Sequence, residues 1–425
     1  MSSEWPHVKL GSLADFQEGY VNPSQREPRY FDGPVKWLRA TDLNDGLVTN
    51  TSRTLSDKGF NSAGKSAVLF KPGSLAISKS GTIGRLGLLG DHMCGNRAVI
   101  NIKPKPNSVP RYLFFVLRHL RPTIETLAEG SVQKNLYVSV LSNLDVPAPP
   151  KELQQAIADI LGVLDDRITL LRETNTTLEA IAQALFKSWF VDFDPVHAKM
   201  QGRAPEGMDE GTAALFPDSF EESELGAVPK GWRSSTLGKS FDLTMGQSPP
   251  GDTYNQSEDG LPFYQGRTDF GFRFPTKRIF CNAPTRLAEI GDALVSVRAP
   301  VGDVNMAIER CCIGRGVASV RHQSGCVGYT LYAMKNLGAH FKNFDTEGTI
   351  FGSINKKDFE ALPVVVPSQG VLVAFDEISK ALDGSIEINE QKIRVLVEIR
   401  DTLLPRLISG QLQLPEVGQF SESLP

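Results

Sequence analysis

In two long stretches of the chain a residue that is apolar, with a few polar exceptions, recurs at every seventh position, and a second such set lies four residues later. In the first stretch these are Ile157, Leu164, Leu171, Leu178 and Leu185, with Leu161, Ile168, Asn175, Ala182 and Trp189. In the second they are Phe375, Leu382, Asn389, Leu396 and Leu403, with Ser379, Ile386, Ile393, Arg400 and Leu407. This period is typical of helices that pack along a seam. We therefore predict two long helices, over residues 151–192 and 368–412, which pack on each other because neither stripe is stable in water.

The whole chain is a tandem repeat. Trp5, Leu10-Gly11 and Thr41-Asp42 recur 227 residues later as Trp232, Leu237-Gly238 and Thr268-Asp269. From there the shift falls to 218, and it relates Gly73–Ser78 to Gly291–Ser296, Gly84 to Gly302, Cys94 to Cys312, Arg97 to Arg315, and Leu144, Val146 and Pro149 to Leu362, Val364 and Pro367. An ordered run of matches over this length indicates a duplication.

The two asparagines on the seams favour an antiparallel pairing of the helices. Subtracting 218 places Asn389 at the equivalent of Leu171. In the numbering of the first repeat, the two asparagines therefore lie on either side of a common centre between positions 171 and 175. In an antiparallel pair the two amides face each other, whereas a parallel pair leaves each unpaired at about 1–3 kcal/mol. We expect an antiparallel coiled coil whose register is set by Asn175 and Asn389. The alternative is that both side chains are solvated.

The rest of each repeat has short apolar runs broken by Gly and Pro, such as residues 74–78 and 293–297. Such runs predict short strands and turns, with a helix near Tyr112–Leu120 in the first repeat. The expected fold class is α/β (mixed α+β): two similar globular domains separated by two long antiparallel helices with pseudo-two-fold symmetry. The expected parts are a globular domain at 1–150, a helix at 151–192, a linker at 193–227, a second globular domain at 228–367, a helix at 368–412 and a tail at 413–425.

Composition and charge narrow the classes of function. The 425 residues carry a net charge of −4, and 40% are hydrophobic, which is ordinary for a globular protein. No apolar run reaches the roughly 18 residues of a membrane span, and the N-terminus lacks a signal pattern, so we expect a cytoplasmic protein. Residues 1–150 and 226–367 carry +6 and +3, whereas 151–225 and 368–425 carry −9 and −4. The globular domains are therefore the candidate DNA-facing parts, because DNA attracts local positive charge.

Motifs for catalysis or metal binding are lacking. Cys311, Cys312, His322 and Cys326 suggest zinc, but they lack a C-x2-C pair, so buried thiols are expected instead. Gly59–Ser66 matches the phosphate-binding pattern G-x-x-x-x-G-K-S by letter. The preceding residues are too polar for a buried strand and Pro72-Gly73 follows too soon for a helix, so we interpret the match as chance. We predict neither a catalytic residue nor a bound metal or cofactor.

The order of these pieces resembles the specificity subunit of type I restriction–modification systems. The segments that carry the resemblance are Trp5–Gly11 and Val228–Gly238, Gly73–Gly84, Leu144–Pro149, Leu185–Phe193 and Leu404–Leu412. The resemblance implies that each globular domain recognises one half of a split target in double-stranded DNA. The helices, roughly 57 Å long, would space the half-sites by about one 34 Å duplex turn or somewhat more. In the second domain Arg298–Gly302 replaces Lys79–Gly84, so any role of Gly81 does not transfer.

The resemblance also implies partners. They are two methyltransferase subunits, which carry S-adenosylmethionine, and restriction/translocase subunits, for which ATP and Mg²⁺ are expected. This chain would be non-catalytic, would bind no cofactor and would not contact a membrane.

Base recognition favours Arg, Lys, Asn, Gln, Ser and Thr on exposed loops. The candidates are Arg39, Lys79, Ser80, Thr82, Arg85, Gln133, Lys134 and Asn135 in the first domain, and Gln265, Arg267, Arg298, Asn355, Lys356 and Lys357 in the second. For each, a solvated surface residue or a structural turn is the alternative. Thr41-Asp42 and Thr268-Asp269 occur in both repeats and are expected to form turns, because residues that read sequence should differ between the halves.

Two other classes of function stay open on the sequence alone. One is a scaffold without DNA, in which two ligand-binding modules sit on a coiled-coil hinge. The other is a stand-alone methyltransferase or ATPase, which would need to bind its own cofactor.

Overall fold

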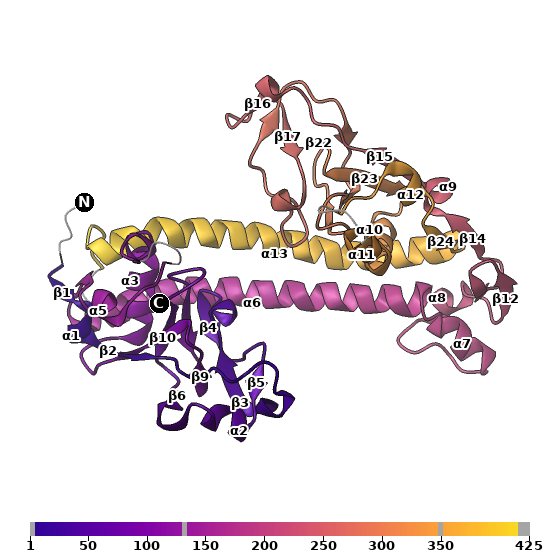
Figure 1. Cartoon of the computed structure of the whole chain (residues 1–425). Helices are drawn as coiled ribbons and strands as arrows, with labels where there is room; N and C mark the ends of the chain where they lie inside the picture. The colour runs from indigo at the N-terminus through magenta and orange to yellow at the C-terminus, as the bar shows by residue number, and fades with distance from the viewer. Residues whose placement is uncertain (1–4, 130–133, 347–351, 415–425) are drawn as a thin grey trace, which may run out of the picture. The chain divides into compact units, whose positions relative to one another are not determined.

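The computed structural model describes residues 5–129, 134–346 and 352–414. The chain forms two compact units, one of Met1–Leu170 with Lys392–Pro425 and one of Leu171–Gln391 (Figure 1). Both divisions fall inside long helices, α6 (Lys151–Phe190) and α13 (Gln369–Ser409). Each unit therefore combines a globular part with one half of each long helix, and the two predicted helices are confirmed.

The first unit contains a main sheet, a second sheet and one separate pair of strands. Its main sheet has the strand order β2-β10-β7-β8-β4, a second has the order β5-β3-β9-β6, and β1 pairs with β11. The strands are β1 (His7–Lys9), β2 (Ala14–Glu18), β3 (Phe31–Leu38), β4 (Gly46–Val48), β5 (Thr54–Leu55), β6 (Leu69–Phe70), β7 (Leu75–Ser78), β8 (Leu86–Leu89), β9 (Met93–Gly95), β10 (Val99–Pro104) and β11 (Asp145–Pro147). The helices are α1 (Leu10–Leu13), α2 (Asp57–Asn61), α3 (Pro110–His119), α4 (Arg121–Thr126) and α5 (Val138–Ser142).

The second unit has the same plan. Its main sheet has the order β15-β23-β20-β21, a second has β16-β18-β17-β22-β19, and β14 pairs with β24. The strands are β14 (Arg233–Thr236), β15 (Phe241–Met245), β16 (Tyr254–Asn255), β17 (Leu261–Tyr264), β18 (Phe280–Cys281), β19 (Leu287–Ala288), β20 (Ala293–Ser296), β21 (Val304–Met306), β22 (Cys311–Ile313), β23 (Val317–His322) and β24 (Pro363–Val366). The helices are α9 (Leu237–Ser240), α10 (Val327–Asn336), α11 (Gly338–Thr346) and α12 (Lys356–Glu360).

The repeat seen in the sequence is therefore a repeat of topology. Strands β2, β10, β7 and β8 correspond in order and pairing to β15, β23, β20 and β21. In both units the second sheet contains one parallel pair, β3 with β9 and β17 with β22. The two globular parts differ mainly in the segments around these strands.

The core of each globular part lies between its main sheet and one amphipathic helix. Strand β7 is buried at all four positions, and it packs in one cluster with Tyr112 and Phe115 of α3, which are fully buried. Pro110 occupies the first turn of α3, where its missing N–H leaves no hydrogen bond unmade. The equivalent α10 packs Tyr329 and Tyr332 beside β20 in the second unit.

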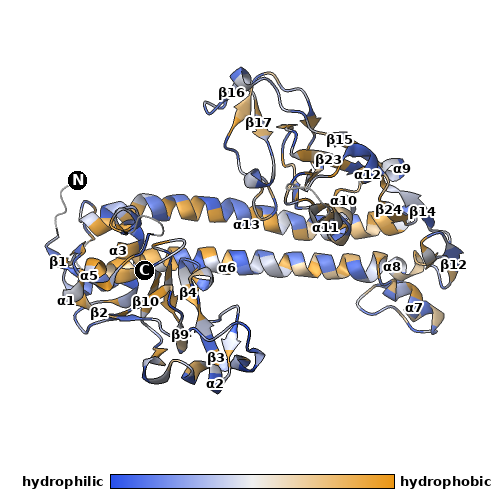
Figure 2. Cartoon of the chain, in the orientation of Figure 1, coloured by the Kyte–Doolittle hydropathy of each residue, from blue (hydrophilic) through white to orange (hydrophobic). Residues whose placement is uncertain are grey.

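The two long helices run antiparallel in each unit. In the first unit Arg400 of α13 binds Asp165 of α6 at 2.8 Å. In the second, Asn389 donates a hydrogen bond to Asn175 at 2.9 Å, and Phe375 packs edge-on against Phe186. Residue numbers thus rise along one helix as they fall along the other. Both helices alternate hydrophobic and polar residues along their length (Figure 2).

The hydrogen bond predicted between the two seam asparagines is present, and a second one extends it. Asn175 is buried, and its amide donates to the carboxylate of Glu390 at 2.8 Å. An Asn389→Ala variant is expected to lose about 1–2 kcal/mol of unfolding free energy because the buried oxygen of Asn175 loses its donor. Chemical denaturation measures this loss. Leucine at both positions is the control, since it leaves no buried polar atom unpaired, and a loss of the same size there would contradict the explanation.

The segment expected as a linker, residues 193–227, contains regular structure. It holds α7 (Asp194–Met200), α8 (Glu210–Ala214), β12 (Phe220–Ser223) and the first half of β13 (Gly226–Pro229), and β12 and β13 form an antiparallel pair. Val196 and Phe216 join the core of the second unit. The segment therefore packs onto the globular part rather than running free. Among the described residues, no helix combines the length and apolarity that a bilayer crossing needs.

Candidate nucleic-acid interface

Four loops of the first unit, which we call the reading loops, lie side by side at one end of its strands. They are residues 39–42 after β3, 79–85 after β7, 96–98 after β9 and 134–136 before α5. Asn96 donates from its backbone N–H to the carbonyl of Leu38 at 3.0 Å, and Lys79 donates to that of Ala98 at 2.8 Å. Leu136 donates to the carbonyl of Lys79 at 2.8 Å. Because β3 and β9 are parallel, their carboxyl ends lie side by side, and this brings the loops together.

The second unit brings its equivalent loops together through the same backbone bonds. The reading loops are 265–269, 297–303, 314–316 and 352–355. Gly314 donates to the carbonyl of Tyr264 at 2.8 Å, Val297 to Gly316 at 3.0 Å and Ile354 to Val297 at 3.1 Å. Each bond matches one of the first unit, so the loops of the two units share one backbone frame.

One serine in each unit organises the longest reading loop. Ser78 accepts a hydrogen bond from the N–H of Arg85 at 2.9 Å, and Ser296 accepts one from Asp303 at 2.9 Å. Each serine also donates to a carbonyl within its loop, Ser78 to Thr82 and Ser296 to Pro300. The same hydrogen bonds thus close both turns, although Lys79–Arg85 and Val297–Asp303 have different sequences and the second contains the cis peptide bond Ala299–Pro300.

The Thr-Asp pairs form turns, as predicted. Asp42 accepts from the N–H of Arg39 at 2.8 Å, and Asp269 accepts from that of Gln265 at 2.6 Å. Asp269 is also bound by Arg278. These aspartates hold the first reading loop of each unit in shape, and their carboxylates are not free for a ligand.

The candidate residues of the first unit divide into exposed and engaged side chains. Thr82, Arg85 and Lys134 are exposed, and Ser80 and Asn135 are half-buried. Lys79 forms an ion pair with Glu18 at 2.8 Å. Arg39 is half-buried beside Trp37 and donates to Ser52 at 2.5 Å. Gln133 lies outside the described residues.

The candidates of the second unit divide in the same way. Gln265, Arg298 and Lys357 are exposed, whereas Arg267 is exposed but paired with Asp303. Lys356 pairs with Glu360 at 3.4 Å. Asn355 caps α12, because its side-chain oxygen accepts from the N–H of Asp358 at 3.0 Å. The side chain of Asn355 therefore stabilises the start of α12.

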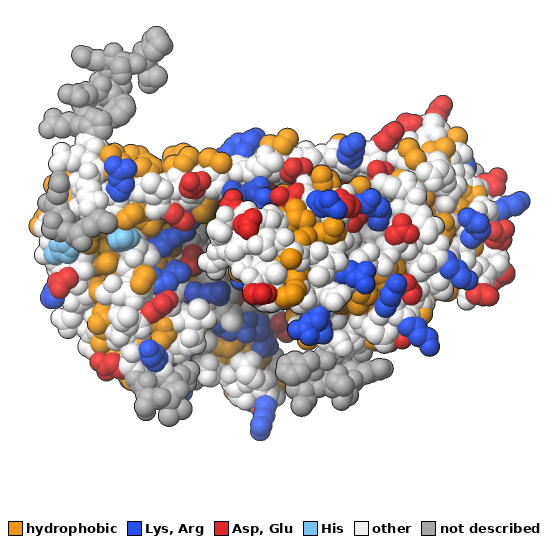
Figure 3. All heavy atoms as spheres, turned by 90° about the horizontal axis from the view of Figure 1, so that it is seen from above, with side chains coloured by type: hydrophobic (Ala, Val, Ile, Leu, Met, Phe, Trp, Pro, Cys, Tyr) orange, Lys and Arg blue, Asp and Glu red, His pale blue; other side chains and the backbone are white. Residues whose placement is uncertain are grey.

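Two arginines on the reading loops were not among the candidates. Arg97 and Arg315 lie at the centre of the loops that follow β9 and β22, and both are exposed. The repeat analysis had already matched them, so their shared position was available as a signal. On the face that Figure 3 shows, Lys and Arg side chains are interspersed with Asp and Glu.

A buried ion network connects the segment that follows the second unit's first reading loop to both long helices. Arg273, fully buried, binds Glu179 of α6 and Asp383 of α13, and it donates to the hydroxyl of Tyr332 at 2.8 Å. Lys335 of α10 also binds Glu179. Burial raises the pKa of Glu179, but the charges of Arg273 and Lys335 outweigh it and hold this pKa below its usual value. For Asp383 burial prevails, so its pKa lies above the usual value.

The cysteines are buried thiols on strands and at a helix end. Burial raises the pKa of Cys311 to about 12, so this thiol stays protonated at neutral pH. His322 shares a hydrogen bond with Ser324 at 2.6 Å. Within the described ranges, three or more His, Cys, Asp or Glu residues nowhere gather as metal ligands would.

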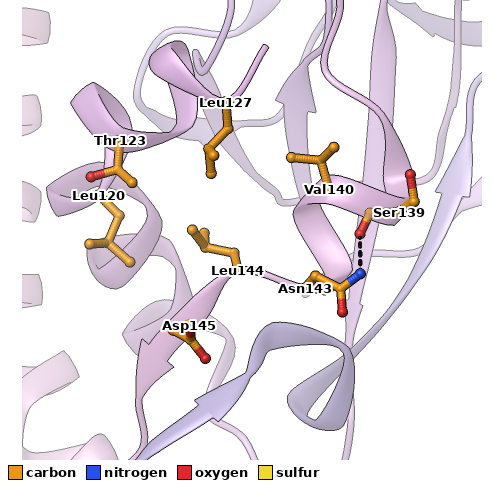
Figure 4. A pocket seen from close by; sticks show the side chains of 8 residues that line it. All are labelled: Leu120, Thr123, Leu127, Ser139, Val140, Asn143, Leu144 and Asp145. Atoms are coloured by element: carbon orange, nitrogen blue, oxygen red, sulfur yellow. Dashed lines mark hydrogen bonds between the residues drawn. The ribbon is translucent and has the colours of Figure 1, made fainter. Parts of the chain in front are cut away.

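A hollow of about 510 Å³ in the first unit lies among the end of α3, α4 and α5 (Figure 4). Leu120, Leu127, Val140 and Leu144 supply its apolar lining, and Asn143 donates to the carbonyl of Ser139 at 2.9 Å. Its one ionisable lining residue, Asp145, is held by Lys9 at 2.9 Å. The hollow therefore offers no pair of groups for acid–base chemistry.

The letter match to a phosphate-binding loop does not form one. Gly59 lies inside the short helix α2, and Gly64–Ser66 form a separate helical turn. A phosphate-binding loop needs a strand before it and a long helix directly after it. The interpretation of this match as chance is confirmed.

Paired recognition folds joined by long helices define a class of DNA specificity proteins, and sequence comparison places the chain in it. A profile for the type I restriction modification DNA specificity domain matches residues 2–180. The chain is 30% identical to the specificity subunit of the type I restriction enzyme HindI of Haemophilus influenzae, over 73% of this chain and 79% of that protein. It is also 30% identical to a specificity subunit assigned to the enzyme MjaX of Methanocaldococcus jannaschii, over 74% of this chain and 71% of that protein.

The chain therefore belongs to the specificity subunits of type I restriction–modification systems, which recognise DNA targets. Its fold agrees with a solved S subunit of such a system from M. genitalium, with a TM-score of 0.58, 18% identity and 97% of both chains covered. This likeness confirms the predicted fold class.

Proposed function

We propose that this chain is the sequence-specific DNA-binding subunit of a type I restriction–modification complex and that it reads a split, bipartite target. The observation that carries the proposal is the shared frame of the reading loops. The same backbone bonds and the same serine turn hold different side chains in the two units. Two similar readers with different side chains suit a target whose two halves differ.

The side chains that differ at equivalent loop positions are the proposed base readers. Ser80 of the first unit corresponds to Arg298 of the second, and Asn135 corresponds to Ser353, because each pair has the same place in the hydrogen-bonded frame. Arginine reads guanine and asparagine reads adenine by bidentate hydrogen bonds in the major groove. The exposed Thr82, Arg85, Lys134, Gln265 and Lys357 complete the proposed surface.

The long helices are the proposed spacer between the two half-sites. Helix α6 has 40 residues, which corresponds to about 60 Å. Half-sites roughly one or two duplex turns apart fit a spacer of this length. The register pair Asn175–Asn389 would keep the helices from sliding and so keep the separation constant.

The helices also carry a surface that suits two copies of one partner. With the seam positions lettered a and d, exposed apolar residues recur at positions c and g of both helices. Six of them are equivalent in the repeat: Ile160, Leu170 and Ile181 in α6 and Ile378, Ile388 and Ile399 in α13, each 38–52% exposed. The second set lies 218 residues after the first. Exposed apolar residues kept at equivalent positions mark a contact surface.

The opposite flank of the helix pair is occupied by the globular parts. Asp165 binds Arg118 at 3.1 Å in the first unit, and Asp383 binds Arg273 in the second. Both aspartates lie at position e. The c and g positions therefore stay open for other chains, and we propose that two methyltransferase subunits dock there. Restriction/translocase subunits would join this complex.

Catalysis is assigned to the partner subunits in this proposal. S-adenosylmethionine would bind the methyltransferase subunits, and ATP and Mg²⁺ the restriction/translocase subunits. The contribution of this chain is to choose the DNA site and to place the partners on it.

Salt-dependent binding to duplex DNA tests the proposal. The chain assembled with its methyltransferase partner should bind a duplex carrying the target, and log Kd should rise steeply with log salt because counterions are released. Mapping genomic methylation in a host with the complete system supplies the target. Binding that does not depend on salt, or on the target sequence, would favour a scaffold without DNA.

An Arg298→Ala variant should weaken binding to the target by about 1–3 kcal/mol. The assembly with the methyltransferase should stay intact, because Arg298 is exposed on the reading loops and not on the helices. Fluorescence anisotropy measures the affinity, and gel filtration measures the assembly. Unchanged affinity for the target would remove Arg298 from the proposed readers.

A further inference from the structure

One cation has the same place in the reading loops of both units. Arg97 follows β9 and Arg315 follows β22, at the 218-residue shift that relates the repeats. Several other loop positions change type between the units: Ala40 corresponds to Arg267, Ser80 to Arg298 and Arg85 to Asp303. Arginine in both halves therefore serves a purpose that does not depend on which half-site is read.

The backbone around the two arginines is fixed by the same three hydrogen bonds. In the first unit these are Asn96 to Leu38 at 3.0 Å, Val99 to Asn96 at 3.2 Å and Lys79 to Ala98 at 2.8 Å. In the second unit they are Gly314 to Tyr264 at 2.8 Å, Val317 to Gly314 at 3.0 Å and Val297 to Gly316 at 3.0 Å. Both arginines thus project from the same point of the frame.

A glycine on a neighbouring loop lies close against each of these backbones. A Cβ at Gly19 would lie 2.2 Å from the carbonyl oxygen of Asn96, and one at Gly246 would lie 2.2 Å from that of Gly314. Neither position accepts a side chain without moving the arginine loop. The arginine loops are therefore preorganised in both units.

The two guanidinium groups keep their charge available. Within the residues that the structure describes, neither forms an ion pair with a carboxylate, and Arg315 donates only to the hydroxyl of Ser248, at 3.3 Å. Lys79 and Arg267 of the reading loops are each paired with an acid, as is Lys356 at the start of α12. Arg97 and Arg315 are thus exposed cations on a rigid support.

We infer that Arg97 and Arg315 are a matched pair of contacts to the DNA phosphate backbone, one for each half-site. The inference rests on the proposed function. Phosphate is the part of the duplex that is the same in both half-sites, and the planar guanidinium binds it through two parallel hydrogen bonds. The pair orients each unit on the duplex, while the side chains that differ between the units read the bases.

Replacing each arginine with glutamine tests the inference in the chain assembled with its methyltransferase subunits. Arg97→Gln and Arg315→Gln are measured singly and together, on a duplex with the mapped target and on an unrelated duplex. Each change should weaken binding to both duplexes by the same factor, roughly tenfold. Each should also reduce the slope of log Kd against log salt by about 0.9.

Lys230→Gln is the matched control, because Lys230 is exposed and lies outside the reading loops. It should leave affinity and slope unchanged, and thermal unfolding should be the same for all variants. A loss confined to the target duplex would make the arginines base readers and overturn the inference, as would unchanged affinity. If the unaltered complex shows no salt-dependent binding to DNA, the proposed function fails as well.

Discussion

Replacing Arg273 with methionine is expected to destabilise the second unit by about 3–5 kcal/mol. Arg273 is fully buried, and its guanidinium is the shared partner of Glu179 and Asp383. Methionine fills a similar volume, but it leaves Asp383 without a cation and Glu179 with Lys335 alone. A buried carboxylate without its partner must either stay charged in an apolar site or take up a proton.

Hydrogen exchange followed by mass spectrometry measures this loss, because it resolves the two units. Peptides from β20 and β23 should exchange faster in the variant, whereas peptides from β7 and β10 should not change. Arg267→Met is the control: its ion pair with Asp303 is 59% exposed on the arginine side, so a change of at most about 1 kcal/mol is expected.

The explanation also predicts a partial rescue. Adding Asp383→Asn to Arg273→Met removes the buried charge that the variant leaves unpaired, while Glu179 keeps Lys335, so part of the lost free energy should return. If Arg273→Met were no more destabilising than Arg267→Met, the network would not contribute to the stability of the second unit.

Glutamate at both Leu170 and Ile388 is expected to weaken binding of the methyltransferase subunits by 100-fold or more. The two residues are equivalent in the repeat, and they are 51% and 52% exposed on the proposed docking surface. Each copy of the partner would have to bury one unpaired carboxylate, and 100-fold corresponds to about 2.7 kcal/mol. Either change alone should leave a complex that retains one copy of the partner.

Native mass spectrometry of the mixed subunits distinguishes these complexes. Thr169→Glu with Gln391→Glu is the control, since both residues are exposed on the helices and neither lies at a c or g position of the seven-residue pattern. The helical circular dichroism should be the same for all variants. A full complement of methyltransferase on the Leu170 and Ile388 variant would contradict docking at this surface.

The sequence predicted the long helices well because their signal is periodic and local. A seam residue at each seventh position needs no knowledge of the rest of the chain, and Asn175 and Asn389 stood out as polar exceptions on it. The duplication was also visible, since it needs only a comparison of the chain with itself. The topology of the globular parts was not, because β3 and β9 pair across more than 50 residues of chain.

Some of the candidate residues make contacts within the chain that the sequence alone does not show. Asn355 was taken as a base reader, although the spacing of Asn355 and Asp358 is typical of a helix cap. Lys79 and Arg267 are paired with acids that lie 61 and 36 residues away, which composition does not reveal. Nothing in the sequence singled out Arg273, because its partners belong to two helices far along the chain.

The serine-held turn after β7 and β20 has a consequence for how such proteins diversify. Its shape depends on main-chain groups, on Ser78 or Ser296, and on Gly81, Gly84 and Gly302, which have positive φ, while Thr82 and Arg298 between them are exposed. Mutations at those positions therefore alter the surface offered to a ligand at small expense in folding free energy. Substitutions at these few positions can therefore change the binding preference without compensating changes elsewhere in the chain.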